Sequence, residues 1–154
     1  GGEHRAGALG SVLSVLYGAR HGLKDGEVWG AVELATQRDL PPAARERCHH
    51  LIKGFTMIVG GFRSFSHEEV RRVVYRKYIR TPEALQRLHL LMARYFAHFP
   101  ANPRKVDCLP YHLEVSGSWA ALKGCLVDLD LFALFWDRPG AHPGGDGGGG
   151  GGGG

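Results

Sequence analysis

The sequence predicts a mainly α-helical fold that contains one small β-hairpin. Apolar side chains recur at the three- and four-residue spacing of amphipathic helices through most of residues 6–136. One stretch breaks this pattern, because Thr56–Val59 and Phe62–Ser66 are short runs rich in β-branched and aromatic residues, with Gly60 and Gly61 between them. Two consecutive glycines suit the positive φ angles of a tight two-residue turn, so we expect two antiparallel strands here.

Three helices are expected before the hairpin. The first covers residues 6–19 and the second residues 23–35, which the breaker "QRDLPP" at 37–42 ends. The third covers residues 42–55. Each carries an apolar stripe on one face: Leu9, Val12, Leu13, Leu16 and Tyr17; then Val28, Trp29 and Val32; then Ala44, Cys48, Leu51, Ile52 and Phe55.

Two capped helices are expected after the hairpin. Ser66 and Glu69 have the spacing of a capping box, in which each side chain bonds the backbone amide of the other residue, and they open a helix over residues 67–79. Thr81 is the expected N-cap of the next helix, with Pro82 at the first helical position, where its missing N–H is harmless. This long helix covers residues 82–99.

Over residues 106–136 the sequence predicts a helix, a turn, a second helix and a further short helix. Pro110 suits an early helical position, and Gly117 suits a turn. Ser118 is the expected cap of the helix that begins with Trp119. The last helix carries a dense apolar and aromatic run, Phe132 to Trp136, which needs a neighbour to cover it.

These elements divide the chain into four parts. Residues 1–7 form a tail, and residues 8–80 have the helix and hairpin order of a winged-helix subdomain. Residues 81–136 form α-helical hairpins of repeat type, which usually stack in arrays. Residues 137–154 form a Gly-rich tail that is expected to be disordered, because it has almost no side chains to bury.

Composition narrows the class of protein. The formal net charge is +4, and residues 41–80 hold 9 basic and 3 acidic side chains, so the surplus lies in the middle of the chain. The three cysteines match no disulfide or zinc pattern, which predicts buried thiols in a reducing compartment and therefore a cytoplasmic protein. No membrane span and no secretory signal are visible. The first residue is Gly, and we expect the chain to be part of a longer protein.

No catalytic or metal-binding pattern stands out. Adjacent His49 and His50 point about 100° apart on a helix, so they cannot reach one ion together. His67, Glu68 and Glu69 are better explained by the start of a helix, where acidic residues are favoured, than by acid–base catalysis. The phosphate-binding motif of P-loop ATPases and the nucleophile elbow are both missing. We expect no enzyme activity, no metal and no cofactor in this chain.

The basic residues leave two kinds of partner open. Arg45, Arg47 and Arg63 lie on the helix before the hairpin and just after the turn, where a winged helix contacts DNA, but the helix lacks the residues expected for base readout. Arg71, Arg72 and Arg76 lie on the helix behind the hairpin. We favour protein partners with acidic surfaces for this second group and keep nucleic-acid binding as the alternative.

Several phrases resemble one family when read in order. "LYGARHGLKDGEVWGAVEL" and "FSHEEVRRVVYRKYI" resemble the winged-helix segment that follows the nucleotide-binding domain in NACHT-type (STAND) signal-transduction ATPases. "LHLLMARYF" and "RKVDCLPYHLEVSGSWAALKGCLVDLDLF" resemble the passage that leads into their repeats. The match spans about residues 9–136 and is most similar to the tetratricopeptide-repeat (TPR) members, including the nephrocystin-like group, with WD-repeat members second.

This resemblance implies a role within a larger protein. In the family, the winged helix packs on the nucleotide-binding domain and helps to hold the closed, ADP-bound state, while the repeats sense partners. His67 is the residue that the resemblance places nearest the nucleotide, and ATP or ADP would be held only by an upstream domain. The implied function is a non-catalytic regulatory and scaffold segment that makes interdomain and protein–protein contacts.

Overall fold

The structure is a computed structural model that describes residues 2–136, and side chains within residues 7–128, 130, 131, 133 and 134. Its helices are α1 (Gly2–Gly18), α2 (Asp25–Thr36), α3 (Pro42–Ile52), α4 (Glu68–Val74), the π-helix η1 (Tyr75–Ile79), α5 (Pro82–Ala97), α6 (Pro103–Val115), α7 (Trp119–Leu126) and α8 (Leu129–Trp136). The strands are β1 (Thr56–Val59) and β2 (Phe62–Phe65). The predicted fold class, mainly α with one hairpin, is therefore confirmed. None of the described helices is long and apolar enough to cross a membrane.

The structure tests the predicted tail at the N-terminal end of the chain but not the one at the C-terminal end. Helix α1 begins at Gly2, four residues before its predicted start at residue 6, so it extends into the segment 1–7 that we expected to be a tail. The Gly-rich tail predicted at 137–154 lies outside the described residues.

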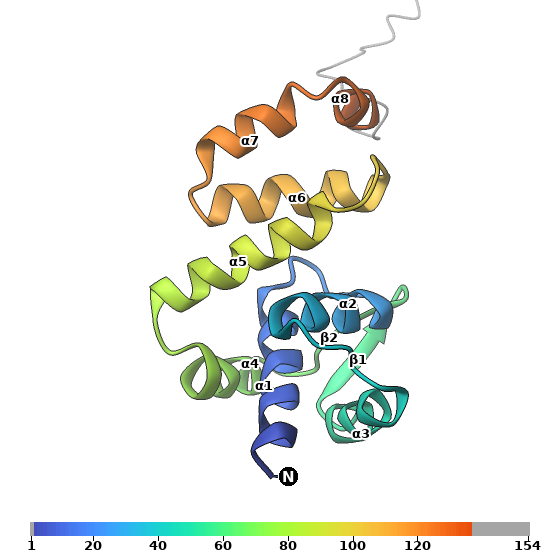
Figure 1. Cartoon of the computed structure of the whole chain (residues 1–154), viewed down its shortest axis with the longest axis vertical. Helices are drawn as coiled ribbons and strands as arrows, with labels where there is room; N and C mark the ends of the chain where they lie inside the picture. Colours follow the sequence, from blue (N-terminus) through green and yellow to red (C-terminus); the bar gives the residue numbers. More distant parts are fainter. Residues whose placement is uncertain (1, 137–154) are drawn as a thin grey trace, which may run out of the picture.

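The hairpin forms where the sequence predicted it. Val59 pairs with Phe62 across the turn, and Gly60 and Gly61 have φ angles of 60° and 86°, as a tight turn between antiparallel strands requires. Leu23, between α1 and α2, adds an isolated antiparallel bridge to Arg63 of β2 through two backbone hydrogen bonds of 3.0 and 2.7 Å. The first part of the fold therefore has the order helix, bridge, helix, helix and two strands (Figure 1), and its assignment as a winged helix stays a prediction.

The capping box predicted for Ser66 and Glu69 is wrong. The Ser66 amide donates to the Phe55 carbonyl at 3.0 Å, which continues the strand pairing by one residue and uses the amide that Glu69 would have bonded. Helix α4 therefore begins later, with His67 at the N-cap and no side-chain capping bond. The Glu69 carboxylate instead accepts from Arg72 at 2.7 Å.

The helix predicted over residues 67–79 is α-helical only as far as Val74. It continues past Val74 as a π-helix that ends where the Arg80 amide donates to the Tyr75 carbonyl at 2.8 Å. Arg80 then has a φ of 71°, which is strained for a residue other than glycine. The next helix starts as predicted, because the Thr81 hydroxyl accepts from the Ala84 amide at 3.1 Å.

Helix α6 starts earlier than predicted. Asn102 is the N-cap, and its side chain accepts from the Lys105 amide at 2.9 Å, with Pro103 at the first position. Pro110 consequently lies inside the helix and not near its start. The predicted capping bond of Ser118 is also wrong: Ser118 occupies the N-cap position of α7, but its hydroxyl lies 2.9 Å from the hydroxyl of Ser116.

Helix α5 joins the two parts of the fold. It packs against α1 and α2 on one side and forms an antiparallel pair with α6 on the other, and α7 lies beyond α6 (Figure 1). Buried side chains from Val12 to Leu131 form one continuous core. The predicted division at 80 and 81 stays a prediction. Of the predicted terminal run, Phe132, Phe135 and Trp136 have side chains outside the described residues.

Candidate functional site

Two adjoining cavities form the candidate site, one on each side of Arg71. The first has a volume of about 340 Å³ and lies between the end of α1 and the start of α4, where Arg20, His21 and His67 line it. The second has a volume of about 350 Å³. Glu68 and Arg71 line both, so the two cavities share a wall.

His67 lies at the edge of the first cavity in an exposed position. Its neighbours in the lining, Arg20 and His21, come from a segment more than forty residues earlier in the sequence, after the end of α1. Sequence reasoning identified His67 but missed these two residues, because no local pattern indicates that the α1 end lies beside the α4 start. The arrangement gathers imidazole and guanidinium groups, which bind anions.

Arg71 is held by an aromatic ring. Its guanidinium carbon lies 4.1 Å from the centroid of the Tyr17 ring, and this ring is 5.7 Å from the ring of Tyr75. Among the described residues, no hydrogen-bond acceptor for the Arg71 guanidinium is observed, and Arg71 lines both cavities.

The other two predicted interaction residues, Arg72 and Arg76, line the second cavity and are exposed. Arg72 donates to Glu69 at 2.7 Å on the surface. The structure therefore brings Arg71, Arg72 and Arg76 to one face, as their helical spacing predicted. Arg72 forms an ion pair with Glu69, whereas Arg71 packs on the ring of Tyr17.

Arg63 does not lie where the DNA-binding alternative needs it. It is 4% exposed, and its guanidinium donates to Asp25 Oδ1 at 2.8 Å and to Thr56 Oγ1 at 2.9 Å. His49 Nε2 lies 3.0 Å from its remaining nitrogen. Arg63 therefore connects the hairpin to α2 and α3 from inside the molecule, and the expectation that it contacts a phosphate is wrong.

Arg45 and Arg47 of α3 are more accessible than Arg63. Arg45 bonds Glu33 at 2.6 Å and the Leu40 carbonyl at 2.7 Å, so it fixes the end of α2 to the start of α3. Arg47 is exposed. Of the three arginines in the DNA-binding alternative, Arg63 is buried, and both Arg63 and Arg45 are engaged in ion pairs.

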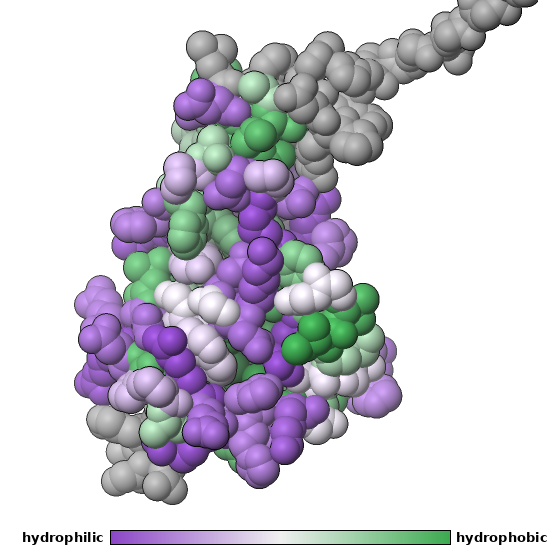
Figure 2. Space-filling view, turned by 90° about the vertical axis from the view of Figure 1, so that its right-hand side faces the viewer, coloured by the Kyte–Doolittle hydropathy of each residue, from purple (hydrophilic) through white to green (hydrophobic). Residues whose placement is uncertain are grey.

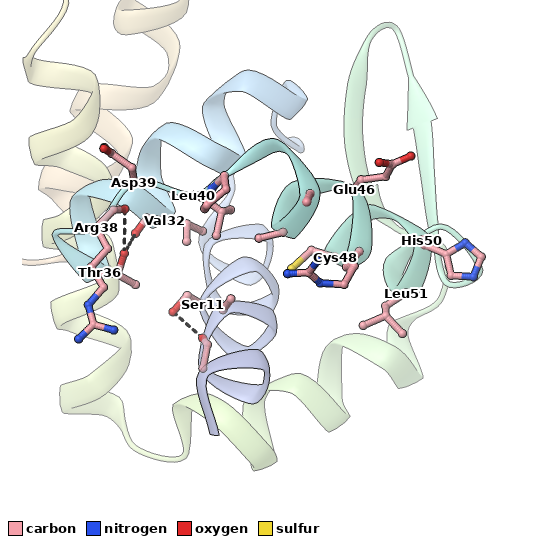
Figure 3. A pocket seen from close by; sticks show the side chains of 16 residues that line it. Ser11, Val32, Thr36, Arg38, Asp39, Leu40, Glu46, Cys48, His50 and Leu51 are labelled. Carbon is pink, nitrogen blue, oxygen red and sulfur yellow. Dashed lines mark hydrogen bonds between the residues drawn. The ribbon is translucent and has the colours of Figure 1, made fainter. Parts of the chain in front are cut away.

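A third cavity, with a volume of about 1170 Å³, is an apolar groove between α1, the end of α2 and α3 (Figure 3). Figure 3 shows Val32, Leu40 and Cys48 around it, with Arg38, Asp39 and Glu46 toward its rim. Sequence reasoning did not predict it, since small residues near the start of α1 and on α3 leave the space and carry no motif of their own.

A buried histidine pair joins α5 to α6. The Nδ1 atoms of His89 and His112 lie 2.9 Å apart, and His112 is completely buried. Burial, and then the neighbouring His89 and arginines, lower the pKa of His112 to about 3, and burial also lowers the pKa of His89. Both rings are therefore neutral near pH 7. Both rings lie in the core, and His112 Nε2 has no hydrogen-bond partner among the described residues.

The three cysteines are free and buried, as predicted. Burial raises the pKa of each thiol, and that of Cys108 to about 11, so these thiols stay protonated and poorly nucleophilic at neutral pH. In the part of the chain that the structure describes, no group of three or more His, Cys, Asp or Glu side chains is placed to hold a metal ion.

The sequence is distantly similar to a much longer protein. It is 28% identical over 127 residues to a TPR repeat-containing protein of Dictyostelium discoideum. The similarity covers 82% of this chain but only 8% of that protein. No protein-family model and no solved structure matches the chain.

Proposed function

We propose that this chain is a non-catalytic regulatory and scaffold segment of a multidomain, cytoplasmic TPR-repeat protein, and that it lies beside a NACHT-like ATPase domain. Its task is to hold neighbouring domains in a defined arrangement and to contact protein partners. The observation that carries this proposal is the extent of the similarity: nearly all of this fold corresponds to a small part of a long repeat-containing protein.

The surface of α7 supports stacking against a further helical pair. Trp119 is 64% exposed and Val127, just after α7, is 69% exposed, with Val115 and Leu126 also exposed nearby. Figure 2 shows hydrophobic surface at this end of the molecule. Helical repeats bury such faces against the next repeat, because a single pair cannot cover its own apolar side.

The cavity beside His67 supports the second half of the proposal. Arg20, His21 and His67 line a polar hollow on the winged-helix part, away from the α7–α8 end. We assign this face to the contact with the ATPase domain, with His67 toward the phosphates of its bound nucleotide. ATP and ADP would be bound by that domain and not by this chain.

Sequencing of the full-length transcript tests the architecture directly. We expect a P-loop motif within a few hundred residues upstream and helical repeats of about 34 residues downstream. A reading frame that contains neither would refute the proposal. In the full-length protein, His67→Ala should increase ADP release, whereas His98→Ala, which replaces an exposed histidine just after α5 that does not line the cavity, should leave it unchanged.

A further inference from the structure

We infer that the cavity on the Tyr17 side of Arg71 is a recognition site for a carboxylate side chain on an acidic segment of a protein. The inference rests on the proposed function as a protein-contact module and adds the chemistry of the partner. The residues that carry it are Tyr17, Arg71 and Arg76.

Arg71 is pre-organised to bind a planar anion. Its guanidinium is packed on Tyr17 at 4.1 Å, which restricts its rotamers and covers one face of the planar group. The N–H donors lie in that plane, and among the described residues none of them has an acceptor. A carboxylate can therefore accept two parallel hydrogen bonds from Arg71 without displacing an internal partner.

The surrounding charges favour an isolated carboxylate over a polyanion. Arg20, Arg71, Arg72 and Arg76 outnumber Glu68 and Glu69 on this face, which gives it a positive surplus. However, Glu68 lies in the wall of both cavities, and Glu69 is paired with Arg72. A nucleic-acid backbone would bring several phosphates against these two carboxylates, whereas an acidic peptide can place one carboxylate at Arg71 and keep its others outside.

The site is also shaped for a side chain. The rings of Tyr17 and Tyr75 lie 5.7 Å apart and form an apolar wall of the cavity, which the exposed Arg76 also lines. The methylene groups of a glutamate side chain can contact this wall while its carboxylate meets Arg71. Arg76 adds attraction at longer range, which raises the association rate more than the affinity.

Fluorescence anisotropy on the 154-residue chain tests the inference with three labelled probes: a ten-residue peptide of alternating glutamate and glycine, the same peptide with glutamine, and a single-stranded oligonucleotide of ten nucleotides. We expect the glutamate peptide to bind and the other two to bind at least about tenfold more weakly in low salt. Binding of the oligonucleotide more tightly than the glutamate peptide would overturn the inference, as would equal binding of both peptides or no binding at millimolar concentration.

Variants locate the site on the surface. Arg71→Met should weaken glutamate-peptide binding about fivefold or more, because the variant loses a charge-assisted bidentate hydrogen bond. Arg87→Met, which removes an exposed arginine of α5, should change it less than twofold. Unchanged binding by Arg71→Met, in a sample whose circular dichroism matches the unmodified chain, would refute the assignment. A transcript without ATPase and repeats would refute the proposed function but leave this binding result standing.

Discussion

Replacing Arg63 by methionine separates a structural role for this residue from a DNA-binding role. The substitution keeps most of the buried side-chain length and removes the guanidinium. The structure places that guanidinium among Asp25, Thr56 and His49, at 4% exposure. We therefore expect the variant to lose stability and to show no specific change in nucleic-acid binding.

The expected loss of unfolding free energy depends on whether each partner of Arg63 has another hydrogen-bond partner in the variant. Asp25 is 44% exposed, so water can replace its ion pair, and the loss there is well below the 3 to 5 kcal/mol of a fully buried pair. Thr56 still donates to the Ile52 carbonyl at 2.8 Å, and His49 is exposed, so each loses only an ordinary hydrogen bond of about 1 kcal/mol. We expect a total loss of about 2 to 3 kcal/mol, or a decrease of roughly 5 to 10 °C in the unfolding temperature.

Thermal and urea unfolding followed by circular dichroism measure this loss. Arg47→Met is the matched control, because Arg47 is exposed on α3, and its unfolding free energy should change by less than about 0.5 kcal/mol. If Arg63→Met unfolds like the control and loses oligonucleotide affinity with a steep salt dependence, Arg63 is a surface phosphate contact and the buried network is wrong.

Three further substitutions or conditions test other parts of the fold. Arg104→Met should cost about 2 kcal/mol in urea unfolding, since it removes a two-bond ion pair to a mostly buried Glu27, and Glu27→Gln in the same molecule should recover part of that loss; full additivity of the two changes would contradict the pairing. Because the pKa of His112 is lowered from 6.5 to about 3, the folded state excludes a proton that the unfolded chain binds, so stability should fall as pH decreases from about 6.5 toward 3. His112→Leu should reduce that slope, and an unchanged slope would show that other groups cause it. Gly22→Ala should cost more than about 2 kcal/mol, because Gly22 has a φ of 86° and a Cβ would lie 2.7 Å from a backbone oxygen, whereas Gly26→Ala in α2 has open space and should stabilise by up to about 1 kcal/mol; similar melting temperatures for the two would refute the bridge geometry.

Local signals in the sequence predicted local structure well. The hairpin was predictable from Gly60 and Gly61, because glycine adopts positive φ angles without constraint from a neighbouring element. The start of α5 was predictable from Thr81 and Pro82. The capping box failed for a non-local reason: the Ser66 amide had a competing acceptor in Phe55, which only the paired strands bring within reach. The four-residue motif contains no information about the competing Phe55 carbonyl.

The candidate site could be predicted only in part, for the same reason. Helical spacing was enough to place Arg71, Arg72 and Arg76 on one face. It could not show that Arg71 packs on Tyr17, because that contact joins helices separated by two other helices and the hairpin. The burial of Arg63 likewise depends on Asp25, which is 38 residues away. The sequence therefore shows how many basic residues a segment contains, but only the fold determines which of them are exposed to solvent.

The segment from Arg20 to Lys24 links α1 and α2 to α6. Arg20 donates to the Asp107 carbonyl of α6 at 2.9 Å, and Arg104 of α6 donates to the Gly22 carbonyl at 3.0 Å. Glu27 accepts from Arg104 and also from the Lys24 amide at 2.8 Å, so one carboxylate fixes both the start of α2 and its contact with α6. A displacement of α6 must consequently move this segment or break these bonds.

The same segment also lines the cavity beside His67. Arg20 and His21 form part of that cavity, so its shape depends on bonds made by a helix of the C-terminal part. If repeats stack beyond α7, as proposed, a force on them would reach this cavity through α6 and the Arg104 ion pair, without any contact between the repeats and the proposed ATPase domain. Arg104→Met should then increase ADP release in the full-length protein as His67→Ala does, although Arg104 does not line the cavity itself and reaches its wall only through the bond to the Gly22 carbonyl. Unchanged ADP release in a variant that has lost the expected 2 kcal/mol of stability would show that the two parts are joined mechanically but not coupled in function.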